Sequence, residues 1–136
     1  MFHAPIKIDP MPTGWDGSFN DAGDTFLAMN DELAIVQISS SYHAKDFQAF
    51  CKACMEREAR GSSLQDRKAT DPKPASVGPQ GTLEYDVTGK DGDLPKHLHI
   101  YMMPVRKTWG FMYCRCTEEQ WERYKKVFEE MVKNLK

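Results

Sequence analysis

Residues 82–136 decide the fold of this chain, and they read TLEYDVTGKDGDLPKHLHIYMMPVRKTWGFMYCRCTEEQWERYKKVFEEMVKNLK. Apolar and polar side chains alternate over residues 82–88, a period of two that predicts a strand with one buried face. Residues 89–92 predict a turn, after which residues 96–105 and 109–116 predict two further strands. Consecutive strands joined by short turns pair in antiparallel fashion, so this part of the chain predicts an antiparallel sheet.

The chain ends on an amphipathic helix, which we expect over residues 117–136. The tetrapeptide Thr-Glu-Glu-Gln at 117–120 has the pattern of a capping box, in which the first and last side chains each satisfy a backbone amide at the start of a helix. Large apolar side chains then recur at spacings of three and four, which places them on one helical face that packs on the sheet core. These side chains are Trp121, Tyr124, Phe128, Met131 and Leu135.

The first half of the chain adds a hairpin and a second helix. Thr25–Asn30 and Leu33–Ser39 are apolar runs of strand length, and Asn30-Asp31 between them is a turn signal. Over residues 44–60 the apolar side chains recur at helical spacing. Gly61 is a fitting stop for this helix, because glycine enters a left-handed cap without a steric penalty.

The remaining stretches are expected to be loops. Met11–Asp16 predicts a turn that delivers Trp15 to the edge of the core. Residues 61–81 are polar and contain three prolines, which predicts a long surface excursion with one edge strand near Leu64–Lys68.

The resulting order of elements, β-β-α-(β)-β-β-β-α, predicts an α+β fold. We expect an α/β/α sandwich in which a mainly antiparallel sheet is covered by two amphipathic helices. The chain has 136 residues, of which 40% are apolar, and this suffices for one hydrophobic core but not for a second. Residues 1–136 are therefore expected to form a single domain.

Several segments of the chain resemble the PsbP-like superfamily. They are Pro12–Gly17, Ala34–Ile38, Ala44–Phe47, Gly81–Val87, Thr117–Trp121, Tyr124 and Phe128–Met131. The superfamily includes the photosystem II extrinsic PsbP proteins, the Ran-binding Mog proteins, bacterial DcrB-type lipoproteins and small cytoplasmic chaperones of type VI secretion effectors. The resemblance implies an α/β/α sandwich over roughly residues 12–135, and a role in binding and scaffolding rather than catalysis. The proline-rich middle of the chain and its four cysteines depart from the family pattern, so the subfamily stays open.

Charge and hydropathy exclude two classes of partner. The net charge is −2 and the sequence pI is about 6.1, which argues against a dedicated nucleic-acid binder, because such proteins carry an excess of positive charge. No apolar run approaches the roughly 20 residues that span a bilayer.

Residues Met1–Pro5 lack the charged and apolar regions of a signal peptide. We therefore expect a cytoplasmic protein if Met1 is the native start, and otherwise an exported form whose signal has been removed.

The four cysteines form two close pairs. Cys51 and Cys54 lie inside a predicted helix rather than at its N-terminus, where the helix dipole would lower a thiol pKa, so we interpret them as small buried hydrophobes. Cys114 and Cys116 share one face of a predicted strand. If that face meets the first helix, the four thiols could hold zinc, or a disulfide could join helix and strand as an exported protein allows. The C-x-C spacing is a poor one for zinc, and reduced thiols suit the cytoplasm better.

Two histidines, His97 and His99, occupy alternate positions of a predicted strand and therefore share one of its faces. Such a pair ligates zinc or copper when a third ligand arrives. His3, His43 or Asp93 are the candidates for that ligand, and nothing in the sequence selects one of them. We therefore interpret the pair as part of a polar strand face, and we expect no bound metal and no cofactor.

The sequence contains no pattern that identifies an enzyme. A defensible Ser-His-acid or Cys-His arrangement and a glycine-rich phosphate loop are both missing from it. We therefore expect a non-enzymatic protein-binding or scaffolding module whose partner is another protein, while the identity of that partner and the oligomeric state stay open. Aromatic side chains of two neighbouring strands are the expected anchors for this partner. The candidate partner-binding residues are His97, His99, Tyr101, Trp109 and Tyr113.

Two other classes of function stay open. One is a metal-binding protein, for zinc or copper, or a redox protein, and the residues it would use are Cys51, Cys54, Cys114 and Cys116 or His97 and His99. The other is a protein with a small-ligand pocket between helix and sheet, which methionine side chains would line because they adapt to irregular ligands.

Overall fold

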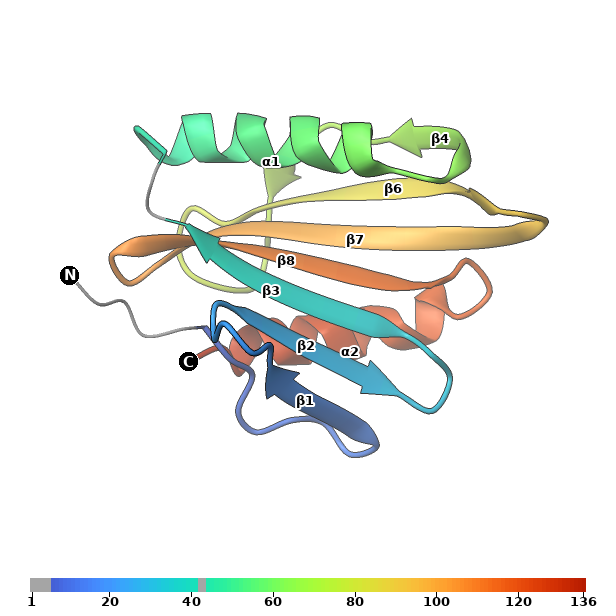
Figure 1. Ribbon diagram of the computed structural model, residues 1–136, viewed down its shortest axis with the longest axis horizontal. Coiled ribbons are helices and arrows are strands. Elements are labelled where there is room, and N and C mark those ends of the chain that lie inside the picture. The colour runs from blue at the N-terminus through green and yellow to red at the C-terminus, as the bar shows by residue number, and fades with distance from the viewer. Residues whose placement is uncertain (1–5, 42–43) are drawn as a thin grey trace.

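The computed structural model describes residues 6–41 and 44–136 (Figure 1). Within these ranges the chain forms one eight-stranded antiparallel sheet and two helices, which confirms the predicted α+β fold. The strands lie in the order β1-β2-β3-β8-β7-β6-β4, and β5 pairs with β6 beside β4. The elements are β1 (Trp15–Phe19), β2 (Thr25–Asn30), β3 (Ile35–Ser41), α1 (Phe47–Gly61), β4 (Gln65–Ala69), β5 (Lys73–Pro74), β6 (Leu83–Asp91), β7 (Leu94–Val105), β8 (Thr108–Thr117) and α2 (Trp121–Lys133).

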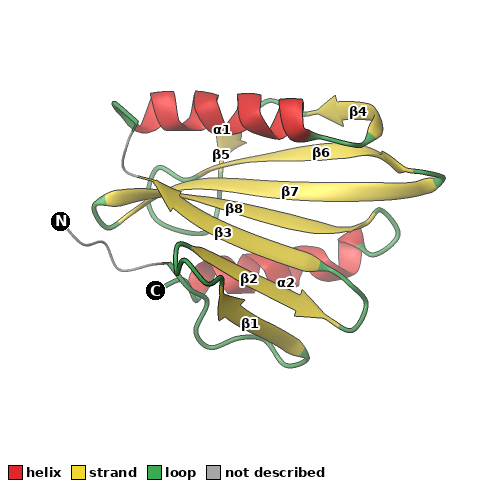
Figure 2. Cartoon of the chain, viewed as in Figure 1, coloured by secondary structure: helices red, strands yellow, loops and turns green. Residues whose placement is uncertain are grey.

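The two helices pack on opposite faces of the sheet (Figure 2). Successive side chains of a strand point to opposite faces, and β7 divides accordingly: Ile100 and Met102 lie in a core with α1, whereas Tyr101 and Met103 lie in a core with α2. The central strands are therefore buried on both sides, which explains why β7 reads as a nearly continuous apolar run.

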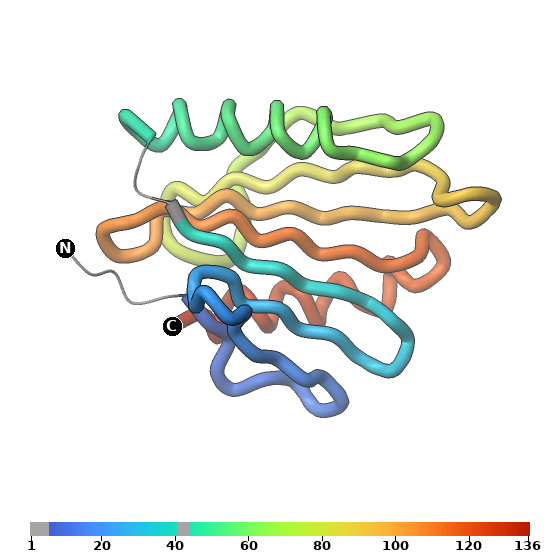
Figure 3. Tube along the Cα trace, in the orientation of Figure 1, coloured from blue at the N-terminus to red at the C-terminus, as the bar shows by residue number. Residues whose placement is uncertain are grey.

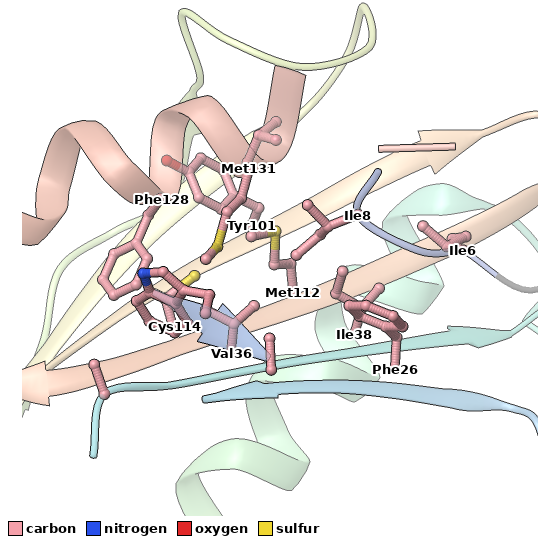
Figure 4. Close-up of a cluster of buried hydrophobic side chains, with 14 of the residues drawn as sticks. Ile6, Ile8, Phe26, Val36, Ile38, Tyr101, Met112, Cys114, Phe128 and Met131 are labelled. Atoms are coloured by element: carbon pink, nitrogen blue, oxygen red, sulfur yellow. The ribbon is translucent and has the colours of Figure 1, made fainter. Parts of the chain in front are cut away.

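The structure has a hydrophobic core on each face of the sheet, where the sequence predicted a single one, and the core under α2 is the larger (Figure 4). Phe128 and Met131 of α2 lie fully buried against the sheet. Ile6 and Ile8 enter the same core, and the backbone near Ile8 pairs with the C-terminus, with Lys7 N donating to Lys136 O at 3.0 Å. Figure 3 shows these two terminal segments side by side. Ile6, Ile8 and Leu135 therefore contribute to this core.

The first strand was not predicted. Trp15 is buried, as expected, but it begins β1 rather than ending a turn, and it faces Asn30 of β2 in the pair register. Only the inward positions of this strand carry large side chains, Trp15 and Phe19, while the intervening residues are small or polar. A strand with so few apolar residues has no clear period in the sequence.

Both helices are shorter than predicted. Helix α1 begins at Phe47, because the Asp46 side chain accepts a hydrogen bond from Ala49 N at 2.8 Å and so caps the helix. Gly61 is its last residue, and an extended Ser62 rather than a left-handed glycine forms the C-cap.

The predicted capping box at the start of α2 forms both of its hydrogen bonds. Thr117 N donates to Gln120 Oε1 at 3.0 Å, and Gln120 N donates to Thr117 Oγ1 at 3.1 Å. These bonds close a turn, and the helix itself begins after it, at Trp121. Trp121 is only partly buried, so the core position expected for it belongs to Phe128, one of the helix residues that face the sheet.

Phe128→Ala tests the assignment of α2 to the larger core. The side chain is fully buried and lies beside Trp15 and Tyr124, with ring centroids 6.2 and 5.9 Å away. Its removal leaves a cavity, so we expect the free energy of unfolding in urea to fall by about 3–5 kcal/mol. The exposed neighbour Lys126→Ala is the control and is expected to change it by less than about 0.5 kcal/mol. A loss below about 1 kcal/mol for Phe128→Ala would contradict this packing.

Candidate functional site

The five residues predicted to bind a partner do not form one surface. His97, His99 and Tyr101 point to the α2 face of the sheet and are buried. Trp109 and Tyr113 point to the α1 face and are partly buried there. The register explains the separation, because His99 lies opposite Cys114 in the β7–β8 pair, so Tyr113, one position earlier on β8, faces the other way.

The two histidines belong to a chain of alternating carboxylates and imidazoles, which we call the imidazole array. Asp86 lies at its centre, with Oδ1 at 2.7 Å from His97 Nε2 and 2.7 Å from His99 Nδ1. The outer nitrogens also meet carboxylates: His97 Nδ1 is 3.0 Å from Glu118 Oε2, and His99 Nε2 is 3.3 Å from Glu84 Oε2. The array is therefore Glu118–His97–Asp86–His99–Glu84.

Strand pairing places most members of the array. Asp86 and His99 are direct partners in the β6–β7 ladder, and Glu84 lies two residues before Asp86 on the same face of β6. Glu118 follows β8 and is held by a backbone hydrogen bond, in which its N–H donates to Pro95 O at 3.0 Å. The array thus stands mainly on two paired central strands, which are among the most rigid positions in a sheet protein.

The first turn of α2 covers the array. Trp121 stacks on the His97 ring with centroids 4.0 Å apart and an interplanar angle of 10°, and it lies 5.1 Å from the His99 ring. Tyr101 meets His99 edge to face at 4.7 Å. His97 and His99 are consequently only 7% and 5% exposed. Trp121 also borders the apolar core, with its ring centroid 6.2 Å from that of Phe128, so it lies between the array and the core and stays partly exposed.

The array has an unusual protonation requirement. A neutral imidazole carries one N–H, yet each of these rings meets a carboxylate at both nitrogens. Burial alone lowers the pKa of His97, but the hydrogen bonds to Asp86 and Glu118 outweigh it and raise that pKa above its ordinary value. Burial likewise raises the pKa of Asp86, but hydrogen bonds from the two imidazoles hold it well below its usual range. In the absence of another cation, the array therefore favours protonated imidazole.

The third member of a possible metal-binding group is Asp86, which the sequence interpretation missed. Asp86, His97 and His99 are the group whose ligand atoms lie within 4.8 Å of one another among the described residues. Of the ligands suggested from the sequence, Asp93 lies in the β6–β7 turn and takes no part in this group, and His3 and His43 lie outside the described residues. The two-residue turn Gly92-Asp93 was the available signal, because a hairpin centred between these two residues pairs Asp86 with His99.

The four cysteines cannot converge. Cys51 and Cys54 lie in the core with α1, and Cys114 and Cys116 lie in the core with α2, so the sheet separates the two pairs. A zinc site made of all four thiols and a disulfide between helix and strand, both suggested as alternatives, are therefore wrong. Burial also raises the pKa of Cys51 to about 11 and that of Cys116 to about 12, which keeps these thiols protonated and unreactive.

Helix α1 covers only part of its face of the sheet. It packs on β6, β7 and β8, while the same face of β2 and β3 has no helix over it (Figure 1). Leu27 and Met29 of β2 are 42% and 38% exposed there, although both are large and apolar. Together with three partly buried neighbours they form a surface that we call the open sheet face. Its residues are Leu27, Met29, Ile35, Phe111 and Tyr113.

A hollow of about 200 Å³ borders the open sheet face. It lies between the C-terminal half of α1 and strand β8, and Phe111 and Tyr113 belong both to its wall and to the open sheet face. Arg57, Glu58 and Arg115 add charged groups to its lining. The α1 face thus combines exposed apolar side chains with a neighbouring recess of mixed polarity.

Comparison with solved structures identifies the fold. PA94 of Pseudomonas aeruginosa, a protein of unknown function proposed as a regulator, matches with a TM-score of 0.58 and 15% identity, over 90% of this chain and 85% of that one. The cyanobacterial PsbP (CyanoP) of Synechocystis sp. PCC 6803 matches with a TM-score of 0.58 and 13% identity, over 99% and 94%. LpqN of Mycobacterium tuberculosis, involved in cell envelope biogenesis, matches with a TM-score of 0.51 and 10% identity, over 96% and 81%.

These similarities establish the fold of the chain but no specific function. At such low identities they show that the chain has the PsbP-like fold, as the sequence resemblance implied. No protein-family model and no curated protein matches the sequence. Among the described residues, neither helix is long and apolar enough to cross a membrane.

The raised pKa of His97 makes stability depend on pH. The folded state binds this proton more tightly than the unfolded chain, so the contribution is fully present below about pH 6.5 and is lost as the pH rises through the folded-state pKa. With a chelator present, we expect the free energy of unfolding in urea to fall as the pH rises above about 6.5.

Glu118→Gln is the matched variant for this measurement, because it removes the carboxylate at His97 Nδ1 while the exposed position tolerates the change. Its free energy of unfolding is expected to fall less steeply over the same pH range. Equal slopes for the two proteins would show that Glu118 does not hold a proton on His97.

Proposed function

We propose that this chain, which has the PsbP-like fold, is a non-enzymatic module that binds another protein through its open sheet face. The observation that carries the proposal is the exposure of Leu27 and Met29 on a sheet face that α1 covers elsewhere. Burying apolar surface is the main driving force of protein association, and these two side chains are available for it.

The composition of the open sheet face supports binding rather than simple exposure to solvent. When one face of an antiparallel sheet is solvated, its side chains are mostly polar. The outer face of β1 follows this rule, with Asp16 and Ser18 opposite Met29 and Leu27. Strands β2 and β8 do not follow it, since they present large apolar and aromatic side chains, while β3 between them presents Ile35 together with the polar Gln37 and Ser39. Apolar side chains interspersed with polar neighbours are compatible with a protein interface, because interfaces as a whole are no more apolar than the rest of a protein surface.

Aromatic anchors lie where this surface meets the hollow beside α1. Phe111 and Tyr113 are partly buried, and their rings border the recess of about 200 Å³. Aromatic side chains next to a recess are frequent energetic centres of interfaces. Of the partner-binding residues predicted from the sequence, the proposal retains Tyr113 as part of this surface. His97, His99 and Tyr101 lie on the other face and are not part of it.

The structural comparisons are compatible with a binding role. The names of the three similar proteins mention a regulator, a PsbP protein and a protein of cell envelope biogenesis, and none of these names specifies a reaction. Proteins of this fold are generally non-catalytic. This supports the proposal that the chain acts by binding, while the partner must be found by experiment.

The experiment uses a photo-crosslinking amino acid at Leu27, expressed in the native host, with the same amino acid at Leu94 as the control. Leu94 is also exposed, at 49%, but it lies at the β6–β7 turn, away from the open sheet face. We expect one protein to crosslink at position 27 and not at position 94. That protein is then purified, and its affinity for the chain is measured.

Two charged variants complete this test. Leu27→Asp is expected to weaken binding of the purified partner by about tenfold or more, because it replaces an apolar side chain that the interface buries with a charge. Leu94→Asp is expected to bind within about twofold of the original chain. Both positions are exposed, so neither change should alter the free energy of unfolding by more than about 0.5 kcal/mol. Equal affinity of the two variants would refute the proposal.

A further inference from the structure

We propose that Asp86, His97 and His99 form a binding site for a divalent transition-metal ion, with Zn²⁺ as its probe. The site lies on the α2 face of the sheet, so it is separate from the open sheet face and does not rest on the function proposed above.

Three ligand atoms converge on one point of the sheet. Asp86 Oδ1 lies 2.7 Å from His97 Nε2 and 2.7 Å from His99 Nδ1, and the ligand atoms of the three residues lie within 4.8 Å of one another. A zinc ion sits about 2.0–2.2 Å from nitrogen and oxygen ligands, so its tetrahedral ligands lie about 3.3–3.6 Å apart, about 0.6–0.9 Å farther than Asp86 Oδ1 now lies from each imidazole nitrogen. Binding an ion here therefore requires side-chain rotations that move Asp86 Oδ1 away from the two rings.

A second observation supports a metal site independently of the converging ligand atoms: the outer nitrogens of both imidazoles meet carboxylates. Metal-bound histidines almost always donate the remaining ring N–H to a carboxylate or carbonyl, which fixes the tautomer and orients the ring. Here Glu118 accepts from His97 Nδ1 at 3.0 Å, and Glu84 accepts from His99 Nε2 at 3.3 Å. With these N–H groups directed outward, both inner nitrogens present lone pairs beside Asp86 Oδ1. A metal ion at this point takes the place of the inner protons and satisfies all three atoms together.

The surroundings leave room for a fourth ligand. The group opens on a hollow of about 290 Å³, which Thr70, Thr88 and Trp121 also line. A water molecule from this hollow would complete a tetrahedral set, while Trp121 shields one face of the His97 ring from solvent.

Ligand type selects a transition metal. Glu84 and Asp86 balance Lys73 and Lys125 around this hollow, so the choice of ion follows from the ligand atoms and not from net charge. Two imidazole nitrogens and one carboxylate suit zinc, copper, iron or nickel, whereas magnesium and calcium prefer oxygen ligands alone.

The test is zinc binding by the untagged chain, stripped with a chelator and kept under a thiol-free reductant. Isothermal titration with ZnCl₂ is expected to give one ion per chain. Glu84→Gln and Glu118→Gln are each expected to weaken zinc binding by about 10–100-fold, because they replace the charged carboxylates that orient the imidazoles by neutral amides, which accept more weakly. His99→Gln, which removes a ligand, is expected to weaken it further. Circular dichroism establishes whether each variant is folded. If His99→Gln does not fold, the two glutamate variants alone test the proposed metal site.

Two controls separate this site from other metal ligands. The double variant His3→Gln and His43→Gln keeps the proposed site and is expected to bind zinc with unchanged affinity, as is Glu119→Gln, whose carboxylate neighbours Glu118 in sequence. Cobalt(II) then reports the ligand type, and we expect its spectrum to lack thiolate charge-transfer bands.

Three results would each overturn the proposal. One is the absence of zinc binding by the stripped chain, which would leave the array as a hydrogen-bonded network alone. Another is equal affinity in the original chain, Glu84→Gln and Glu118→Gln. The third is a thiolate band in the cobalt spectrum, which would place the ion on the cysteines.

Discussion

Strand β7 is paired on both sides and buried on both faces, and its two-residue period determines where every candidate functional group lies. Ile100 and Met102 point to one helix, and Tyr101 and Met103 point to the other. The same alternation carries His97 and His99 to the α2 face. Because a slip of one residue would exchange the two sets, this register underlies the whole arrangement of cores and sites.

The two faces of the sheet consequently have different characters. On the α2 face, the first turn of the helix places Trp121 over a polar array at the end of an otherwise apolar core. On the other face, α1 leaves Leu27 and Met29 without a cover. A buried polar group is stable only when its hydrogen bonds are satisfied, and the array meets this condition through its three carboxylates. Leu27 and Met29, in contrast, have no helix over them within the described residues, which is why we assign them to the contact with a partner.

The sequence was sufficient for the parts of the fold that have a strong period. Alternation over β6 and helical spacing over α2 identified both elements, and the resemblance to PsbP-like proteins agreed with the fold that the structural comparisons show. It was not sufficient for β1, whose inward positions are separated by small and polar residues. Local patterns report which residues share a face, but not which helix covers that face.

The same limit explains the incomplete prediction of the sites. His97 and His99 were recognised as a pair, but their carboxylate Asp86 lies on the neighbouring strand and becomes visible only when the register is known. The cysteine pairs on α1 and β8 were each recognised, yet their separation by the sheet depends on which face of β8 meets α1. Long-range register, rather than composition, was the missing information in both cases.

The most direct test of this division of the sheet is the solvent exposure of its methionine methyl groups, measured by NMR with a soluble paramagnetic relaxation agent. Met29 and Met102 point to the same face, but Met29 is 38% exposed and Met102, under α1, is fully buried. We expect strong broadening of the Met29 methyl signal and little broadening for Met102 and for Met112, which is buried on the opposite face. Equal protection of Met29 and Met102 would show that the face of β2 is covered, and it would contradict the division of the sheet into a covered and an open part.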